Sequence, residues 1–183
     1  MKEINVAFIG PPGSGKTSLI NTAMGEKGLE VISTINAGFS SIIREINEQV
    51  CDIRLWDTPG QQNYLQMAKG YLRNIDIVLF CFFDDLDEYD LYNNAISDTI
   101  PEKAKKWLIQ TKIDIGEQYT VGNEFLNKNF IEQFFKTSAL QNIGIEDLLK
   151  AIASLEKDPM SITPQPQPRP IIERIKENFQ SFC

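Results

Sequence analysis

Short apolar runs alternate with amphipathic segments along most of the chain. Residues 4–9 are nearly all apolar and end at Gly10, a pattern typical of a strand buried on both faces. Apolar or alternating runs predict five further strands, at 39–46, 50–56, 75–83, 107–110 and 134–136. Helical spacing, clearest where Ile145, Leu148, Leu149 and Ile152 share one face, predicts helices at 16–24, 66–73, 86–96 and 145–155.

Strands that alternate with helices predict an α/β fold with a mostly parallel sheet, right-handed crossovers and helices on both faces. Because only three polar residues separate 39–46 from 50–56, these runs are predicted to form a hairpin that adds one antiparallel edge strand to a six-stranded sheet. Ligands of such sheets bind beyond the carboxyl ends of the strands. The loops of interest therefore follow Ile9, Trp56, Gln110 and Lys136.

The character of the chain changes after residue 158. Five of the nine prolines lie within 159–170, a composition typical of an extended linker. Beyond it, Ile171, Ile175 and Phe179 fall on one helical face. The sequence thus predicts a single domain at 1–158 and a proline-rich linker with a short amphipathic tail at 159–183.

Composition excludes several classes of function. The 183 residues suit one domain and include no histidine, which rules out histidine-dependent nucleophile pairs and histidine-ligated zinc. The net charge of −7 argues against a general nucleic-acid binder. Cys51, Cys81 and Cys183 are too widely spaced for a disulfide framework, so a reducing, cytoplasmic location is expected. The longest apolar run, 77–83, is too short to cross a bilayer.

Gly10–Thr17 reads G-P-P-G-S-G-K-T and matches the phosphate-binding pattern G-x-x-x-x-G-K-[ST] between a predicted strand and a predicted helix. In such a loop, backbone amides and the helix N-terminus surround a phosphate. Lys16 reaches the β and γ oxygens, and the Thr17 hydroxyl ligates Mg²⁺. A glycine-rich turn with an unrelated lysine is the alternative, but four fixed positions in this context favour phosphate binding. Pro12 removes an amide donor and stiffens the loop, yet the donors from Gly13 onward remain.

Three weaker motifs follow other predicted strands. Asp57–Gly60 places an aspartate where it can hold Mg²⁺, with Gln61 next to orient an attacking water, although alone it reads equally well as a β-turn. Thr111–Asp114 places a carboxylate that can accept from N1–H and N2–H₂ of guanine, with an ordinary turn as the alternative. Ser138–Leu140 can offer a backbone N–H to guanine O6. Alone this motif is very weak, and it supports a guanine site only because it follows the other motifs in the chain.

In this order and spacing, the four motifs resemble those of a small GTPase of the Ras superfamily, over residues 4 to about 156. Residues 32–39, I-S-T-I-N-A-G-F, resemble the first switch of the Rab family, commonly I-S-T-I-G-V-D-F. Residues 55–61, L-W-D-T-P-G-Q, resemble its I-W-D-T-A-G-Q. The resemblance implies the P-loop NTPase G-domain fold, with GTP or GDP and Mg²⁺ as ligands.

The resemblance also implies roles for individual residues. The phosphates would be held by Gly13, Ser14, Gly15, Lys16, Thr17 and Ser18, with Thr34 and Gly60 at the γ-phosphate. Mg²⁺ would be held by Thr17, Thr34 and Asp57, and catalysis would rest on Gln61 and Lys16. Guanine would be bound by Thr111, Lys112, Asp114, Ser138, Ala139 and Leu140. Rab proteins present an aromatic triad to effectors, matched here by Phe39, Trp56 and Tyr71, for which core packing is the alternative.

Departures from the family pattern affect the expected activity. Thr111 replaces the asparagine of N-K-x-D, which we expect to remove a side-chain tie within the base site, and Pro59 replaces an alanine. No arginine lies between Thr17 and Phe39, so the first switch is not expected to supply a stabilising arginine in cis. Intrinsic GTP hydrolysis is therefore predicted to be slow and to be accelerated by a partner.

The implied function is a GTP/GDP-driven switch in vesicular membrane traffic, in the cytoplasm or on the cytosolic face of an endomembrane. Its partners would be GTPase-activating proteins, exchange proteins and effectors, with no nucleic acid. Cys183 is the candidate for lipidation, although no C-a-a-X box is present and the tail is too weakly basic for a polybasic anchor, so peripheral membrane association stays open. Two alternatives also stay open: a guanine-nucleotide-binding interaction module with little turnover, and an ATP-using P-loop ATPase or kinase.

Overall fold

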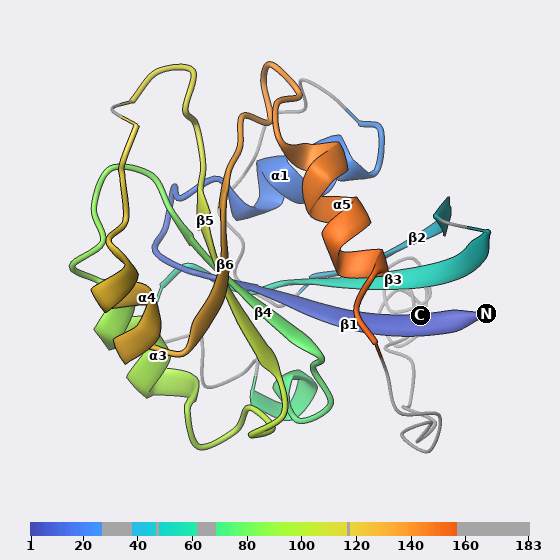
Figure 1. The fold of residues 1–183 in the computed structure, drawn as a ribbon, viewed down its shortest axis with the longest axis horizontal. Helices are drawn as coiled ribbons and strands as arrows, with labels where there is room; N and C mark the ends of the chain where they lie inside the picture. Colours follow the sequence, from blue (N-terminus) through green and yellow to red (C-terminus); the bar gives the residue numbers. More distant parts are fainter. Residues whose placement is uncertain (27–37, 47, 62–68, 117, 157–183) are drawn as a thin grey trace, which may run out of the picture.

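The computed structural model describes residues 1–26, 38–46, 48–61, 69–116 and 118–156 (Figure 1). Several sequence predictions lie outside the described residues. These are Thr34 with most of the first-switch stretch, the start of the helix predicted at 66–73, and the tail at 159–183 with Cys183.

Six strands form one sheet: β1 (Lys2–Ile9), β2 (Gly38–Ile46), β3 (Gln49–Asp57), β4 (Ile77–Phe82), β5 (Lys105–Gln110) and β6 (Ile131–Lys136). Their order across the sheet is β2-β3-β1-β4-β5-β6. β2 and β3 pair antiparallel, and every other neighbouring pair of this sheet is parallel. The predicted α/β fold with one antiparallel edge strand is therefore confirmed.

Helices cover both faces of the sheet. They are α1 (Lys16–Ala23), α3 (Tyr89–Ile96), α4 (Asn123–Lys128) and α5 (Ile145–Ala153), and residues 69–72 form a further helical turn. α1 and α5 lie on one side of the sheet, and α3 and α4 on the other (Figure 1). The sequence does not predict α4, because its two apolar residues, Phe125 and Leu126, are adjacent and so show no helical period.

Several helices and strands begin or end at other residues than the sequence predicts. The run 75–83 is a strand only over Ile77–Phe82, and the helix predicted from 86 begins at Tyr89. Residues before that helix form turns instead, in which a side-chain oxygen of Asp85 accepts the Asp87 amide at 2.7 Å. β5 and β6 begin earlier than predicted because most of their first residues are polar and give no apolar signal.

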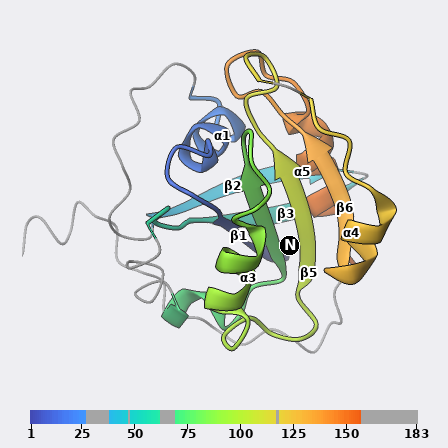
Figure 2. The same cartoon turned by 90° about the vertical axis from the view of Figure 1, so that its left-hand side faces the viewer.

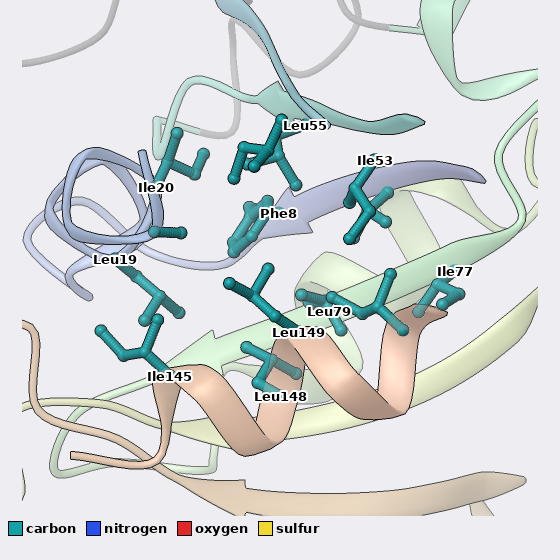
Figure 3. Close-up of a cluster of buried hydrophobic side chains, with 14 of the residues drawn as sticks. Phe8, Leu19, Ile20, Ile53, Leu55, Ile77, Leu79, Ile145, Leu148 and Leu149 are labelled. Atoms are coloured by element: carbon teal, nitrogen blue, oxygen red, sulfur yellow. The ribbon is translucent and has the colours of Figure 1, made fainter. Parts of the chain in front are cut away.

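The alternation of side chains along β1 divides the core into two layers. Ile4, Val6 and Phe8 point into the layer beneath α1 and α5 (Figure 3). Ala7 and Ile9 point into the layer beneath α3. Because helices cover both faces, β1 is nearly all apolar from its third residue onward, as expected for a central parallel strand.

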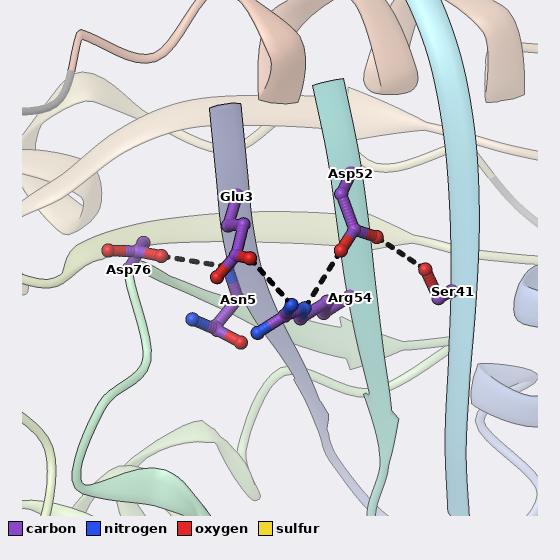
Figure 4. Close-up of polar contacts among 6 residues, drawn as sticks. All are labelled: Glu3, Asn5, Ser41, Asp52, Arg54 and Asp76. Atoms are coloured by element: carbon purple, nitrogen blue, oxygen red, sulfur yellow. Dashed lines mark hydrogen bonds and ion pairs between the residues drawn. The ribbon is translucent and has the colours of Figure 1, made fainter. Parts of the chain in front are cut away.

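A polar network lies toward the amino-terminal half of β1 and β3. Arg54 is 2.8 Å from a carboxylate oxygen of Glu3 and 3.0 Å from one of Asp52, and the Ser41 hydroxyl donates to Asp52 (Figure 4). These polar groups satisfy one another across three neighbouring strands. The network therefore holds the sheet together at the end away from the loops that follow the carboxyl ends.

Candidate nucleotide-binding site

The loop between β1 and α1 is built on glycines that no other residue can replace without strain. Gly10 has φ 146° and Gly15, the N-cap of α1, has φ 83°, both in the region that favours glycine. A Cβ at Gly10 would also collide with the carbonyl oxygen of Cys81 on β4. The loop is thereby packed tightly against the neighbouring strand as it enters the helix.

Lys16, the first residue of α1, is buried, and its side chain turns back over its own loop. Nζ donates to the carbonyl oxygens of Gly10 and Pro11, each at 2.8 Å. Burial lowers the pKa of Lys16, and the neighbouring groups of Cys81 and Asp57 act in the opposite direction. Burial raises the pKa of Cys81 to about 12, so at neutral pH the anionic neighbour is Asp57. The ammonium is thus held inside the loop that the sequence predicts to bind phosphate.

Thr17 and Asp57, distant in sequence, meet beside this loop. The Thr17 hydroxyl donates to Asp57 Oδ2 at 2.6 Å. Asp57 lies opposite Phe8 in the parallel pair of β1 and β3, and the Thr58 hydroxyl donates to the Phe8 carbonyl at 2.6 Å, which fixes the end of β3. Hydroxyl and carboxylate oxygens are ligands that Mg²⁺ prefers, so these two residues fit the predicted metal. Thr34, the third predicted ligand, lies outside the described residues.

Thr111 joins the loop predicted to bind guanine, residues 111–114 (the base loop), to the loop predicted to bind phosphate, residues 10–17 (the phosphate loop). Its buried hydroxyl lies 2.6 Å from the carbonyl oxygen of Ser14 and 3.1 Å from that of Phe82. A hydroxyl has one proton, so it donates to one of these carbonyls at a time, and the shorter distance favours Ser14. The loss of a tie relative to asparagine stays a prediction, but the threonine hydroxyl itself reaches the phosphate loop, because the two loops lie in close contact.

Asp114 and Ser138, from two different loops, form the rest of the predicted base site. The Ser138 hydroxyl donates to Asp114 Oδ1 at 2.5 Å and accepts from the Gln141 amide at 3.0 Å. The Thr22 hydroxyl of α1 lies 3.0 Å from the Ser18 carbonyl of its own helix and 3.2 Å from the Ala139 carbonyl, so this loop lies against the helix after the phosphate loop. The carboxylate of Asp114 is thus held in a fixed orientation by a neighbouring loop.

Lys112 has an unusual backbone for a residue with a side chain, with φ 54°. Its Nζ lies 5.0 Å from the centroid of the Phe83 ring, within the range of a cation–π contact. The structure therefore places the Lys112 side chain against an aromatic ring that no sequence motif marked.

The four predicted motifs meet at the side of the sheet where β1, β3, β5 and β6 end, and the loops that follow β5 and β6 lie at the top of Figure 2. A sequence model of the Ras family matches residues 5–157. The chain belongs to the Ras family of small GTPases.

Several relatives of this Ras-family protein are of Rab type. Ypt/Rab-type GTPase ypt7 of Schizosaccharomyces pombe is 25% identical over 171 residues, which cover 86% of this chain and 83% of ypt7. Ras-related protein Rab-15 of Homo sapiens is 31% identical over 167 residues, which cover 84% of this chain and 78% of Rab-15. Ras-related protein Rab-7B of Dictyostelium discoideum is 26% identical over 197 aligned residues, which cover 100% of this chain and 98% of Rab-7B. The predicted resemblance and the P-loop GTPase fold are confirmed.

The three aromatic residues that match the Rab triad contact one another in this GTPase. The rings of Phe39 and Trp56 have centroids 4.9 Å apart, and those of Trp56 and Tyr71 are stacked at 5.0 Å. Phe39 is 36% exposed, whereas Trp56 is 3% exposed. Trp56 therefore supports the outer rings from beneath and belongs to the core as well as to the triad.

Gly60 lies between the phosphate loop and α3. A Cβ on Gly60 would come within 2.6 Å of Pro12, and the Tyr92 hydroxyl donates to the Gly60 carbonyl at 2.5 Å. Gln61, the next residue, is exposed. No sequence motif marks Tyr92, which reads as an ordinary aromatic residue on the buried face of a helix.

No helix within the described ranges is long and apolar enough to cross a membrane.

Proposed function

We propose that this protein is a Rab-like molecular switch that regulates vesicular membrane traffic, binding GTP or GDP with Mg²⁺ and hydrolysing GTP slowly without a partner. The observation that carries the proposal is the hydrogen bond between the Thr111 hydroxyl and the Ser14 carbonyl. It joins a loop suited to phosphate and a loop suited to guanine into one continuous site. The Rab-type names of the relatives support the assignment to membrane traffic.

The phosphate side would act through charge and backbone donors. The amides from Gly13 to Ser18 and the N-terminus of α1 would surround the phosphates, with the Lys16 ammonium beside them. Thr17 and Asp57 would hold Mg²⁺ together with Thr34, and the metal when bound neutralises phosphate charge. The Gly60 amide would approach the γ-phosphate, and the amide group of Gln61 would orient the attacking water.

The base side would act through hydrogen-bond direction. The Asp114 carboxylate would accept from N1–H and N2–H₂ of guanine, a pair of donors that adenine lacks, while the Ser138 hydroxyl holds the carboxylate in place. The amides of Ala139 and Leu140 would face guanine O6, and Lys112 would lie along the base. This arrangement predicts GTP and GDP as ligands in preference to ATP.

Slow hydrolysis follows from the sequence around the first switch. Phosphoryl transfer depends on positioning and on stabilising negative charge, which an arginine often provides. No arginine lies between residues 17 and 39, and Arg44, the first one after them, donates to the carbonyl of Ala23. A GTPase-activating partner would therefore supply the arginine.

A second candidate, a guanine-nucleotide-binding module with little turnover, is favoured by the contact between Gly60 and Pro12. The loop before Gln61 is packed against a proline of the phosphate loop, where the γ-phosphate would lie. Proline stiffens this part of the loop and offers no amide donor. Hydrolysis would be affected more than binding.

Nucleotide competition followed by single-turnover hydrolysis tests these functions. GTP and GDP should displace a bound fluorescent GDP at far lower concentration than ATP, and phosphate release should be slow and slower still in Gln61→Leu. GTP binding without release, even with activating proteins, would select the second candidate. ATP displacing the probe more strongly than GTP would select an ATP-using enzyme instead.

The tail is part of the same proposal. Residues 1–158 would form the switch domain, and 159–183 would carry Cys183 for attachment of a lipid at the cytosolic face of an endomembrane. Mass spectrometry of the native protein tests this directly. A mass without any lipid would remove Cys183 from the proposal and leave the switch domain untouched.

A further inference from the structure

Gly60 is held from two sides, and only one of them belongs to the phosphate loop. On that side the backbone of Pro12 leaves no space for a side chain on Gly60. On the other side, the hydroxyl of Tyr92 donates to the Gly60 carbonyl at 2.5 Å in a buried hydrogen bond. The loop that leads to Gln61 is therefore tethered to α3 as it passes the phosphate loop.

Tyr92 is suited to be a constant donor. Its ring is buried in the layer beneath α3, and its backbone amide donates to the Glu88 carbonyl at 3.1 Å. Burial, followed by the negative charge of Glu88, raises the pKa of Tyr92 to about 12. The hydroxyl therefore keeps its proton throughout the physiological pH range, and the tether does not depend on pH.

The tether acts on the residue after Gly60. The carbonyl of Gly60 and the amide of Gln61 belong to one planar peptide, so fixing the carbonyl direction also fixes the amide and the Cα atom of Gln61, from which its side chain extends. Gln61 itself is exposed. Without the tether, the peptide that precedes Gln61 would be free to rotate away from the phosphate loop.

We propose that Tyr92 is a positioning residue for Gln61, whose hydroxyl fixes the Gly60–Gln61 peptide beside the phosphate loop. The inference rests on the proposed role of Gln61 in orienting the attacking water. Tyr92 lies on α3, outside the four motifs, and touches neither the phosphates nor the metal in this scheme. It acts on hydrolysis only through the peptide that it holds.

The chain offers a matched control on the same helix. Tyr89 is also buried, and it lines with Tyr92 a small cavity beside Gly10 and Pro11. Within the described part of the chain, the Tyr89 hydroxyl has no hydrogen-bond partner. Tyr89→Phe therefore removes the same atom from a similarly buried tyrosine of the same helix, without breaking a hydrogen bond.

Carbon-13 NMR of the purified full chain, with no nucleotide added, tests the tether itself. The tether is a hydrogen bond to the Gly60 carbonyl, so the Gly60 carbonyl resonance should shift upfield in Tyr92→Phe, where the carbonyl loses this donor. Tyr89→Phe should leave this resonance where it lies in the wild type. An unshifted Gly60 carbonyl resonance in Tyr92→Phe would overturn the inference.

Single-turnover GTP hydrolysis then separates positioning from general stability. Tyr92→Phe should slow phosphate release about five- to tenfold in the wild-type background and less than twofold in a Gln61→Leu background, because the residue to be positioned is then missing. Equal slowing in both backgrounds would overturn the positioning role. A wild-type protein that releases no phosphate would overturn the proposed function, and the Gly60 carbonyl resonance would then decide the tether alone.

Discussion

The phosphate side and the base side of the site are built by different means. On the phosphate side, Lys16 contacts the carbonyl of Gly10, six residues away in the same loop. On the base side, Asp114 is held by Ser138, 24 residues away, and Thr111 contacts Ser14, 97 residues away. A phosphate is bound by consecutive backbone amides and a helix N-terminus, so its site can be one contiguous segment. A base is distinguished by directed side chains, which the sheet must bring together.

The two sides also differ in burial and in the kind of energy they contribute. Lys16 is 5% exposed and carries its charge inside the protein. Asp114 is only half-buried, and it is oriented by a hydroxyl. The phosphate side should therefore set how tightly any nucleotide binds, and the base side should set which nucleotide binds.

Replacing Lys16 should have the largest effect. Lys16→Ala should weaken GTP, GDP and ATP alike by more than about a hundredfold, because loss of one partner of a buried charge pair costs about 3–5 kcal/mol. Lys105→Ala is the control, since Lys105 pairs with Glu132 at the surface, where such pairs contribute little. Titration with fluorescent nucleotides measures both. A loss confined to guanine nucleotides would contradict the division between the two sides.

Asp114→Asn should change the choice of nucleotide rather than the overall affinity for phosphates. Hydrogen bonds to a charged group contribute about 1.5–3 kcal/mol, so GTP should bind roughly ten- to a hundredfold more weakly. Xanthine carries a carbonyl where guanine carries its amino group, and the asparagine amide can donate to it, so XTP should gain affinity. Competition between GTP and XTP measures the switch. As a control, Asp98→Asn removes an exposed charge paired with Lys69 and should leave the affinities for GTP and XTP unchanged. An unchanged GTP affinity in Asp114→Asn would remove Asp114 from the base site.

Ser138→Ala should have a smaller effect of the same kind. It removes the donor that orients the Asp114 carboxylate, and GDP should bind about tenfold more weakly, the low end for a hydrogen bond to a charged group. Ser41→Ala is matched to it, because Ser41 also donates to an aspartate, Asp52, but at the far end of the sheet. Calorimetric titration with GDP compares the two. Equal losses in both variants would show that Ser138 acts on stability alone.

The parts of the molecule that could be predicted from sequence are those whose signal is local. The phosphate loop is eight consecutive residues, and α5 repeats its apolar residues at a helical period. The tie made by Thr111 and the tether made by Tyr92 have no such signal, because each depends on where a distant backbone carbonyl lies. Sheet topology supplies that proximity. Order along the chain therefore indicated that the two predicted base loops lie at one end of the sheet, without revealing the contacts that connect them.

Thr111→Val tests the connection between the two sides. Of the substitutions at Lys16, Asp114, Ser138 and Thr111, it should have the smallest effect on nucleotide binding. Valine has nearly the shape of threonine but cannot donate, so the Ser14 carbonyl loses a hydrogen bond that contributes about 1 kcal/mol. GDP release should become about fivefold faster, because the base loop and the phosphate loop no longer hold each other in place. Thr111→Ser keeps the hydroxyl and should release GDP at close to the wild-type rate.

Stopped-flow release of fluorescent GDP measures the release rate in Thr111→Val. Equilibrium affinities for GDP and ADP then show whether the loss concerns the base alone or the whole nucleotide. If the hydrogen bond couples the two sides, Thr111→Val should weaken both nucleotides by a similar factor, although the substituted residue lies in the base loop. A loss for GDP alone would mean that Thr111 serves base recognition only. The two sides would then be independent binding elements that share one sheet edge, and the hydrogen bond to Ser14 would contribute to folding rather than to nucleotide affinity.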